Sequence, residues 1–94
     1  MSQTSTGVDD LDPPDRAAIG PRVPGGVYRN GYLDLEYRVE EILTGPAAKE
    51  AIPFAEFAIV QTDLTGSQPG RQRVHCTAWN ARRDEVIATP ETES

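Results

Sequence analysis

Residues 33–40 read Leu-Asp-Leu-Glu-Tyr-Arg-Val-Glu, which is the clearest secondary-structure signal in the chain. Apolar and charged side chains alternate with a period of two, which is typical of a β-strand with one buried and one solvated face. A helix would scatter the same apolar side chains around its circumference. The alternation breaks at residues 40–43, where a β-bulge would restore the inward placement of Ile42 or Leu43.

The neighbouring sequence extends this pattern into a sheet. Asn30-Gly31 favours a tight type I′ turn before the first clear strand. Residues 46–51 form either one or two helical turns or a wide loop. Connections this short do not permit parallel crossovers. Three further strands are expected, separated by turns rich in Gly, Pro and Asn, at residues 54–64, 71–80 and 85–89. The sequence predicts a mostly β fold: a small antiparallel sheet or partly open barrel with at most one short helix.

The chain divides into a tail and one small domain. Residues 1–25 hold four prolines, four aspartates and scattered apolar residues, which predicts a disordered tail. Residues 26–90 are the expected β-domain, and residues 91–94 a frayed C-terminus. A domain of about 65 residues is near the lower limit for independent folding. Cys76 is the only cysteine and cannot form a disulfide within the chain, so we expect a homo-oligomer, a dimer formed through the sheet.

Several classes of protein are disfavoured. No apolar stretch approaches the roughly 20 residues that span a bilayer, and no secretory signal is recognisable, so we expect no membrane partner. A single free thiol favours a cytoplasmic location. His75 is the only histidine, and no nucleophile motif or metal-ligand pair accompanies it. We therefore expect no enzymatic activity, no catalytic residue, no metal and no cofactor.

One part of the chain is basic although the whole carries a net charge of −6. Residues 67–89 contain four arginines and two acidic residues, a balance of +2. The expected strand 71–80 places Val74, Cys76 and Ala78 inward and Trp79 outward with its basic neighbours. An indole among arginines can stack a nucleic-acid base, although packing under a loop or in an interface is the commoner fate of a tryptophan. The candidate binding residues are Arg71, Arg73, His75, Trp79, Arg82 and Arg83.

A family resemblance adds to this interpretation. Residues 55–60 (Ala-Glu-Phe-Ala-Ile-Val), residues 73–80 (Arg-Val-His-Cys-Thr-Ala-Trp-Asn) and residues 84–87 (Asp-Glu-Val-Ile) resemble strands of the bacterial single-stranded-DNA-binding protein family. Asn80 stands where that family carries glycine. The resemblance implies an OB-like fold, a homo-oligomer and stacking of bases on aromatic side chains such as Trp79.

Two functions therefore compete. The first is a non-catalytic regulatory or protein-interaction module that presents an acidic face to a basic protein partner. The second is an OB-like module that binds single-stranded nucleic acid through Trp79 and the neighbouring arginines. The negative net charge and the presence of only one lysine, Lys49, favour the first. The acidic face would consist of Asp34, Glu36, Glu40 and Glu41.

Overall fold

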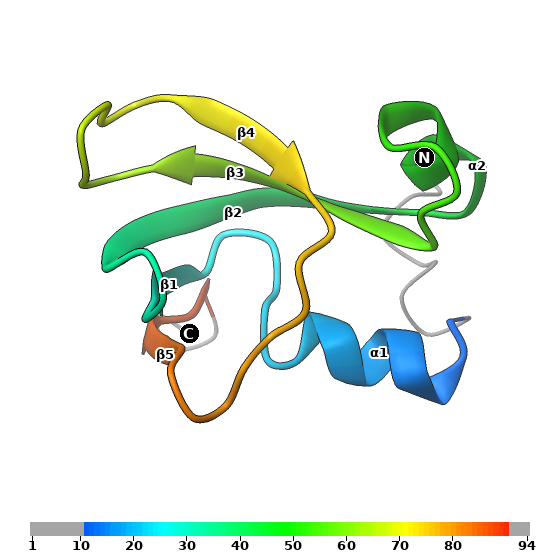
Figure 1. Ribbon diagram of the computed structural model, residues 1–94, viewed down its shortest axis with the longest axis horizontal. Helices are drawn as coiled ribbons and strands as arrows, with labels where there is room; N and C mark the ends of the chain where they lie inside the picture. The colour runs from blue at the N-terminus through cyan, green and yellow to red at the C-terminus, as the bar shows by residue number, and fades with distance from the viewer. Residues whose placement is uncertain (1–10, 91–94) are drawn as a thin grey trace.

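The computed structural model describes residues 11–90, which form one curved, open antiparallel sheet with two short helices (Figure 1). The strands lie in the order β4-β3-β2-β1-β5, so β1 to β4 form a meander and β5 returns beside β1. The mostly β antiparallel fold predicted from the sequence is confirmed, but there are two helices where at most one was expected. The elements are α1 (Pro13–Ile19), β1 (Val27–Asn30), β2 (Leu35–Thr44), α2 (Gly45–Ala51), β3 (Phe57–Asp63), β4 (Gln72–His75) and β5 (Glu85–Ala88).

Strand β2 is the centre of the sheet and follows the alternation of its sequence. Leu35, Tyr37 and Val39 are buried, and the register with β3 shifts between Val39 and Glu41. Beyond this bulge Ile42 is again buried, as the break in the alternation predicted. The buried face of β3 continues the same surface, so the two long strands form the floor of the core.

Strand β2 begins two residues later than the alternation suggested. The tight type I′ turn expected at Asn30-Gly31 is replaced by a longer loop. The Asn30 side chain closes this loop, because its Oδ1 accepts the backbone N–H groups of Tyr32 and Leu33, both at 2.9 Å. Asp34 completes the loop with a φ of 56°. Leu33 therefore lies exposed at the tip of a four-residue loop, not on the buried face of a strand.

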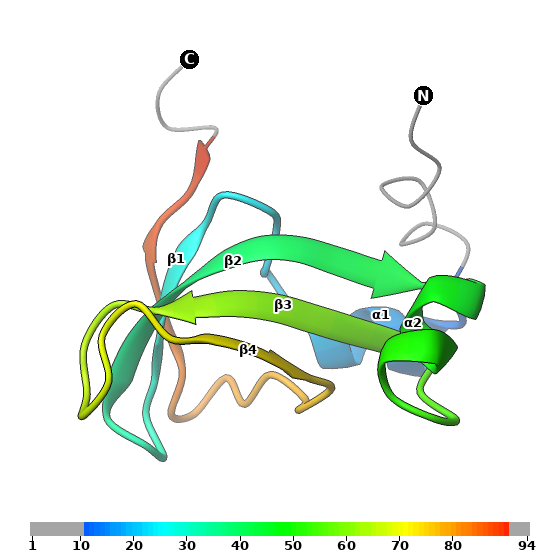
Figure 2. The same cartoon turned by 90° about the horizontal axis from the view of Figure 1, so that it is seen from above.

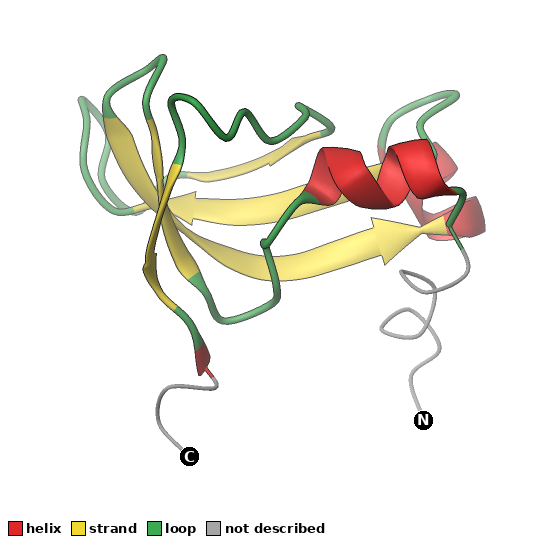
Figure 3. Cartoon of the chain, turned by 90° about the horizontal axis from the view of Figure 1, so that it is seen from below, coloured by secondary structure: helices red, strands yellow, loops and turns green. Residues whose placement is uncertain are grey.

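Helix α1 lies within the segment expected to be disordered. Pro13 and Pro14 occupy its first positions, where a missing N–H is harmless. Ile19, near its end, is 2% exposed and belongs to the core, and Figure 3 shows α1 lying across one face of the sheet. Residues 11–25 are thus folded against the domain, whereas residues 1–10 and 91–94 lie outside the described residues. The proline-rich composition gave no sign of this seven-residue helix, whose last residue, Ile19, is buried.

Residues 76–84 carry the chain from β4, at one edge of the sheet, to β5 at the other (Figures 1 and 2). Where this crossover passes α1, the Trp79 N–H donates to the Ala18 carbonyl at 2.7 Å. The indole lies edge-on to the Tyr28 ring, with 5.8 Å between ring centroids. A Cβ built on Gly20 would lie 2.6 Å from the indole, so the helix terminus and the ring are in close contact.

The buried guanidinium of Arg22 links α1 to the crossover by hydrogen bonds. Arg22 is 4% exposed, and its nitrogens donate to the carbonyls of Ile19, Ala18 and Thr77, each at 2.8 Å. Its guanidinium carbon lies 5.8 Å from the centroid of the Trp79 ring, within the range of a cation–π interaction. One buried cation therefore joins the helix to the crossover.

Substitution of Trp79 tests this arrangement. We expect Trp79→Ala to lower the free energy of unfolding by about 3 kcal/mol, because the indole fills the space between α1, Arg22 and Tyr28. Urea unfolding followed by circular dichroism measures the change. Tyr32→Ala is the matched control, since that ring is 73% exposed, and should change stability by less than about 0.5 kcal/mol. Equal losses in the two variants would contradict the packing role.

Candidate functional site

The predicted binding residues of β4 face the opposite way from the expectation. Arg73 pairs with Gln61 and His75 pairs with Ile59 across the β3–β4 ladder, so both lie on the covered face of the sheet. Val74 is 45% exposed and Cys76 is exposed, although both were expected inward. The physical reason lies in β3. Its covered face ends in two buried polar residues, which require polar partners from the neighbouring strand.

Those polar groups form one continuous hydrogen-bonded network. His75 Nδ1 accepts the Thr77 N–H at 3.1 Å, so Nε2 carries the proton and donates to Gln61 Oε1 at 2.5 Å. The Gln61 amide donates to Asp63 Oδ1 at 2.8 Å, and Arg73 Nε lies 3.1 Å from Asp63 Oδ2. Each member has its partners, so the network secures the β3–β4 edge and leaves His75 without a free proton acceptor.

The same surroundings keep His75 neutral. Burial lowers its pKa to about 4, and the positive charges of Arg22 and Arg73 act in the same direction, against a smaller opposing effect of Asp63. A neutral imidazole fits the observed hydrogen bonds, because the Nδ1 acceptor would be lost on protonation. The placement of His75 thus favours a structural role over nucleic-acid contact.

Trp79 and the arginines are only partly brought together. Trp79 lies in the crossover, packed against the core, and is not part of an open face of the sheet. Arg82 is exposed in the turn at residues 80–84, where its N–H donates to Asn80 Oδ1. Arg71, Arg73 and Arg83 line a different surface, described below. The indole is therefore partly buried and lies on the crossover, not on an open strand face as the sequence suggested.

The expected acidic face is divided by arginines. Asp34 forms an ion pair with Arg29, and Glu40 forms one with Arg38 at 2.8 Å. Hydrogen bonds from Thr62 and Arg38 lower the pKa of Glu40. Glu36 lies opposite Arg29 in the β1–β2 register, and Glu41 is exposed beyond the bulge. This mixture of charges is a weak attractor for a basic partner.

A surface at one end of the sheet is the candidate binding site. It consists of two hollows, of about 210 and 290 Å³, that both include Leu33 among their lining residues. The β1–β2 loop stands between them, with the β3–β4 loop on one side and the end of the crossover on the other. We call this surface the Leu33 groove; its side chains include Tyr32, Leu33, Leu35, Asp63, Gln68, Arg71, Arg73, Arg83 and Asp84.

Close backbone contact builds one wall of the Leu33 groove. The Gly31 N–H donates to Asp84 Oδ1 at 3.1 Å, and a Cβ built on Gly31 would lie 2.1 Å from the Arg83 carbonyl oxygen. Asp84 Oδ2 also accepts the Asn80 N–H at 2.8 Å. Only glycine at position 31 allows the hairpin loop to approach the end of the crossover so closely.

Exposed apolar and cationic side chains meet in this groove. Tyr32 is 73% and Leu33 50% exposed, and the guanidinium carbon of Arg83 lies 5.1 Å from the centroid of the Tyr32 ring. Arg71 donates to Gln68 Oε1. Within residues 11–90 neither Arg71 nor Arg83 forms an ion pair with a carboxylate. Sequence analysis did not identify this site, because the alternation of residues 33–39 assigned Leu33 to a buried strand face.

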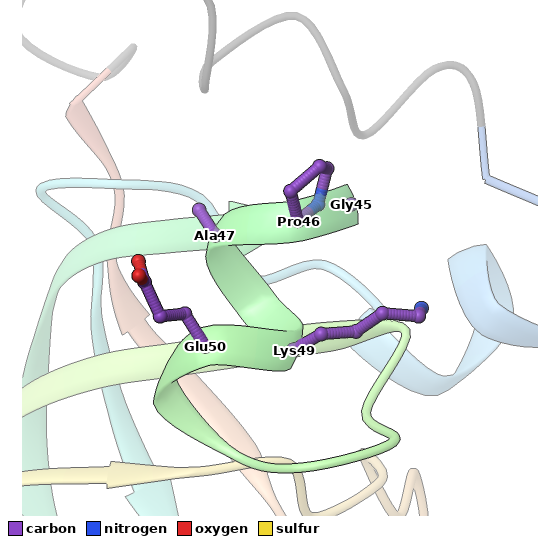
Figure 4. A pocket seen from close by; sticks show the side chains of 5 residues that line it. All are labelled: Gly45, Pro46, Ala47, Lys49 and Glu50. Atoms are coloured by element: carbon purple, nitrogen blue, oxygen red, sulfur yellow. The ribbon is translucent and has the colours of Figure 1, made fainter.

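A further hollow, separate from the Leu33 groove, lies over α2 (Figure 4). It has a volume of about 750 Å³ and is lined by Gly45, Pro46, Ala47, Lys49 and Glu50, all from one helix. Lys49 and Glu50 point away from one another in Figure 4 and do not converge on a common point. This arrangement provides an apolar surface with charges at its rim, and no set of convergent polar groups for a small ligand.

Comparison with known proteins adds no family to this description. No family model, curated protein or solved structure matches the chain. Among the described residues, no three His, Cys, Asp or Glu side chains gather as a metal site would require. No helix in residues 11–90 is long and apolar enough to cross a membrane.

The low pKa of His75 predicts a dependence of stability on pH. The neutral form is favoured in the folded state, so its contribution is complete above pH 6.5 and is lost as the pH falls towards 4. We expect the free energy of unfolding to fall between pH 7 and pH 5 by about 1 kcal/mol more in the wild type than in His75→Asn. Urea titrations at the two pH values give both differences. Equal decreases would show that His75 ionises normally in the folded protein.

Proposed function

We propose that this chain is a non-catalytic protein-interaction module that binds an extended, acidic peptide segment of a partner in the Leu33 groove. The observation that carries the proposal is the pairing of exposed Tyr32 and Leu33 with two arginines that have no carboxylate partner among residues 11–90. Aromatic and arginine side chains are the residues most often found at energetic centres of protein interfaces.

The charges of the groove favour an acidic partner. Its lining holds three arginines and two aspartates, but both aspartates are already engaged. Asp63 pairs with Arg73, and Asp84 accepts backbone N–H groups of Gly31 and Asn80. Arg71 and Arg83 are left to meet carboxylates from outside. In a chain with a net charge of −6, this local excess of positive charge selects partners that the rest of the surface repels.

The apolar part of the groove favours a peptide with alternating side chains. Both hollows share Leu33, so a bound segment could place an apolar side chain against Tyr32 and Leu33 and direct its carboxylates towards Arg71 and Arg83. Regulation would then act through the presence or modification of that segment. This assignment replaces the acidic-face interaction inferred from the sequence with a site of the opposite sign.

Single-stranded nucleic acid is the second candidate, and one observation favours it. Three of the four arginines predicted from the sequence, Arg71, Arg73 and Arg83, line the same groove beside Tyr32. In that case Tyr32, not Trp79, would stack the base. Two free arginines neutralise few phosphates, however, and the net negative charge opposes binding to a polyanion. The peptide is therefore the better match.

Selection from a random peptide library displayed on phage tests the proposal. We expect enriched peptides to carry glutamate or aspartate beside apolar residues. Tyr32→Ala and Arg83→Ala should each weaken binding of a synthetic copy by about tenfold, measured by isothermal titration calorimetry. Arg82→Ala is the matched control, since Arg82 adjoins Arg83 but does not line the groove, and it should bind as the wild type does.

Two results would overturn the proposal. One is a failure to enrich any peptide, or enrichment of peptides whose binding survives both Tyr32→Ala and Arg83→Ala. The other is tight binding of a labelled oligothymidylate that depends on Tyr32 and weakens with salt, which would establish the nucleic-acid function instead.

A further inference from the structure

Phe54 combines two properties that are unusual together. Its side chain is 94% exposed, and its backbone has a φ of 70°. The turn that contains it closes with the Ala55 N–H donating to the Ile52 carbonyl at 3.0 Å, so Pro53 and Phe54 are its two central residues. Pro followed by a residue with positive φ is typical of a type II turn, in which glycine normally takes the second central position.

An aromatic residue at that position of the turn destabilises the turn. A bulky side chain is a rare occupant of the left-handed region, and such strain persists where the surroundings impose it or where function requires it. Phe54 contributes no compensating burial within the described chain, because its ring is almost fully exposed. Its side chain is therefore better explained by contact with another molecule than by the fold of this one.

The surface around Phe54 is suited to a second copy of the same chain. The Lys49 ammonium lies 3.4 Å from the Ala55 carbonyl oxygen and 3.3 Å from Glu56 Oε2, so the Phe54 turn adjoins the hollow over α2 that Lys49 helps to line (Figure 4). A projecting ring and an apolar hollow are thus linked through Lys49 at the same end of the sheet. A two-fold dimer requires such self-complementarity, since the same patch meets itself.

The charges at the rim of the hollow have the same property. Lys49 and Glu50 carry opposite charges on adjacent positions of α2. Lys49 already pairs with Glu56 of its own chain, whereas Glu50 forms no ion pair within residues 11–90. A two-fold axis through the patch can bring Lys49 of one protomer towards Glu50 of the other, twice. Like charges would then not oppose one another across the contact.

We propose that the chain forms a two-fold homodimer in which Phe54 of each protomer inserts into the hollow over α2 of its partner. The interface lies on α2 and the Phe54 turn, instead of on the sheet that the sequence analysis favoured. It is independent of the Leu33 groove, which lies at the other end of β2. A small core explains why the fold would benefit from the additional burial.

Phe54→Gly is the decisive variant. Glycine accepts the positive φ without strain, so the variant should fold and melt about 4 °C higher than the wild type under conditions where both are monomeric. At the same time its dimer should dissociate at least tenfold more readily, measured by sedimentation equilibrium over a range of protein concentrations. Phe54→Leu, which keeps an apolar side chain, should retain most of the dimerisation.

Charge reversal provides a second, independent test. Glu50→Lys should weaken the dimer, because it places positive charges opposite one another across the two-fold axis, whereas Glu50→Gln, which only removes the charge, should weaken it less. The proposal is overturned if the wild type remains monomeric at the highest concentration, or if Phe54→Gly dimerises as strongly as the wild type. Loss of the dimer in Ile87→Lys but not in Phe54→Gly would instead place the interface on the sheet edge.

Discussion

The buried guanidinium of Arg22 holds helix α1 and the crossover against one another. No carboxylate of residues 11–90 pairs with this cation. Three carbonyl oxygens and an indole ring compensate instead for the water that it loses on burial. Because those carbonyls belong to α1 and to the crossover, Arg22 determines where the chain passes between the two edges of the sheet. That path in turn positions the turn at residues 80–84 against Gly31 and so forms a wall of the Leu33 groove. The charge also acts at a distance, since it contributes to the low pKa of His75.

Features of the fold that depend on local sequence pattern were predicted correctly. The alternation of β2, its bulge and the antiparallel sheet follow from local periodicity and short connections, and all appear in the structure. The predicted orientation of β4 was wrong, because arginine and histidine are usually solvated residues. Here Arg73 and His75 lie on the covered face, beside the buried polar residues Gln61 and Asp63. Helix α1 was missed for a related reason: its stability comes from Ile19 and Arg22, whose partners lie elsewhere in the chain.

The candidate site was predictable only in part. The cluster of arginines in residues 71–83 was visible in the composition, and three of its members do line one groove. Tyr32 and Leu33 were not recognised, because their exposure results from the Asn30 side chain closing the loop two residues into the apparent strand. Trp79 was assigned to an open sheet face because the predicted strand was too long. Strand β4 ends at His75, and the crossover that follows is held by contacts of Arg22 with Thr77 and Trp79.

The length of β2 has a consequence for how strongly the protein could hold its partners. Its first residue, Leu35, lines the Leu33 groove and its last, Thr44, leads directly into α2, so the two surfaces are about 30 Å apart. Dimerisation at α2 would leave both grooves unobstructed and directed outwards from the shared axis. Such a dimer is bivalent. A target that carries two copies of the recognised segment would be bound more tightly through avidity, even if each single contact is weak and short-lived.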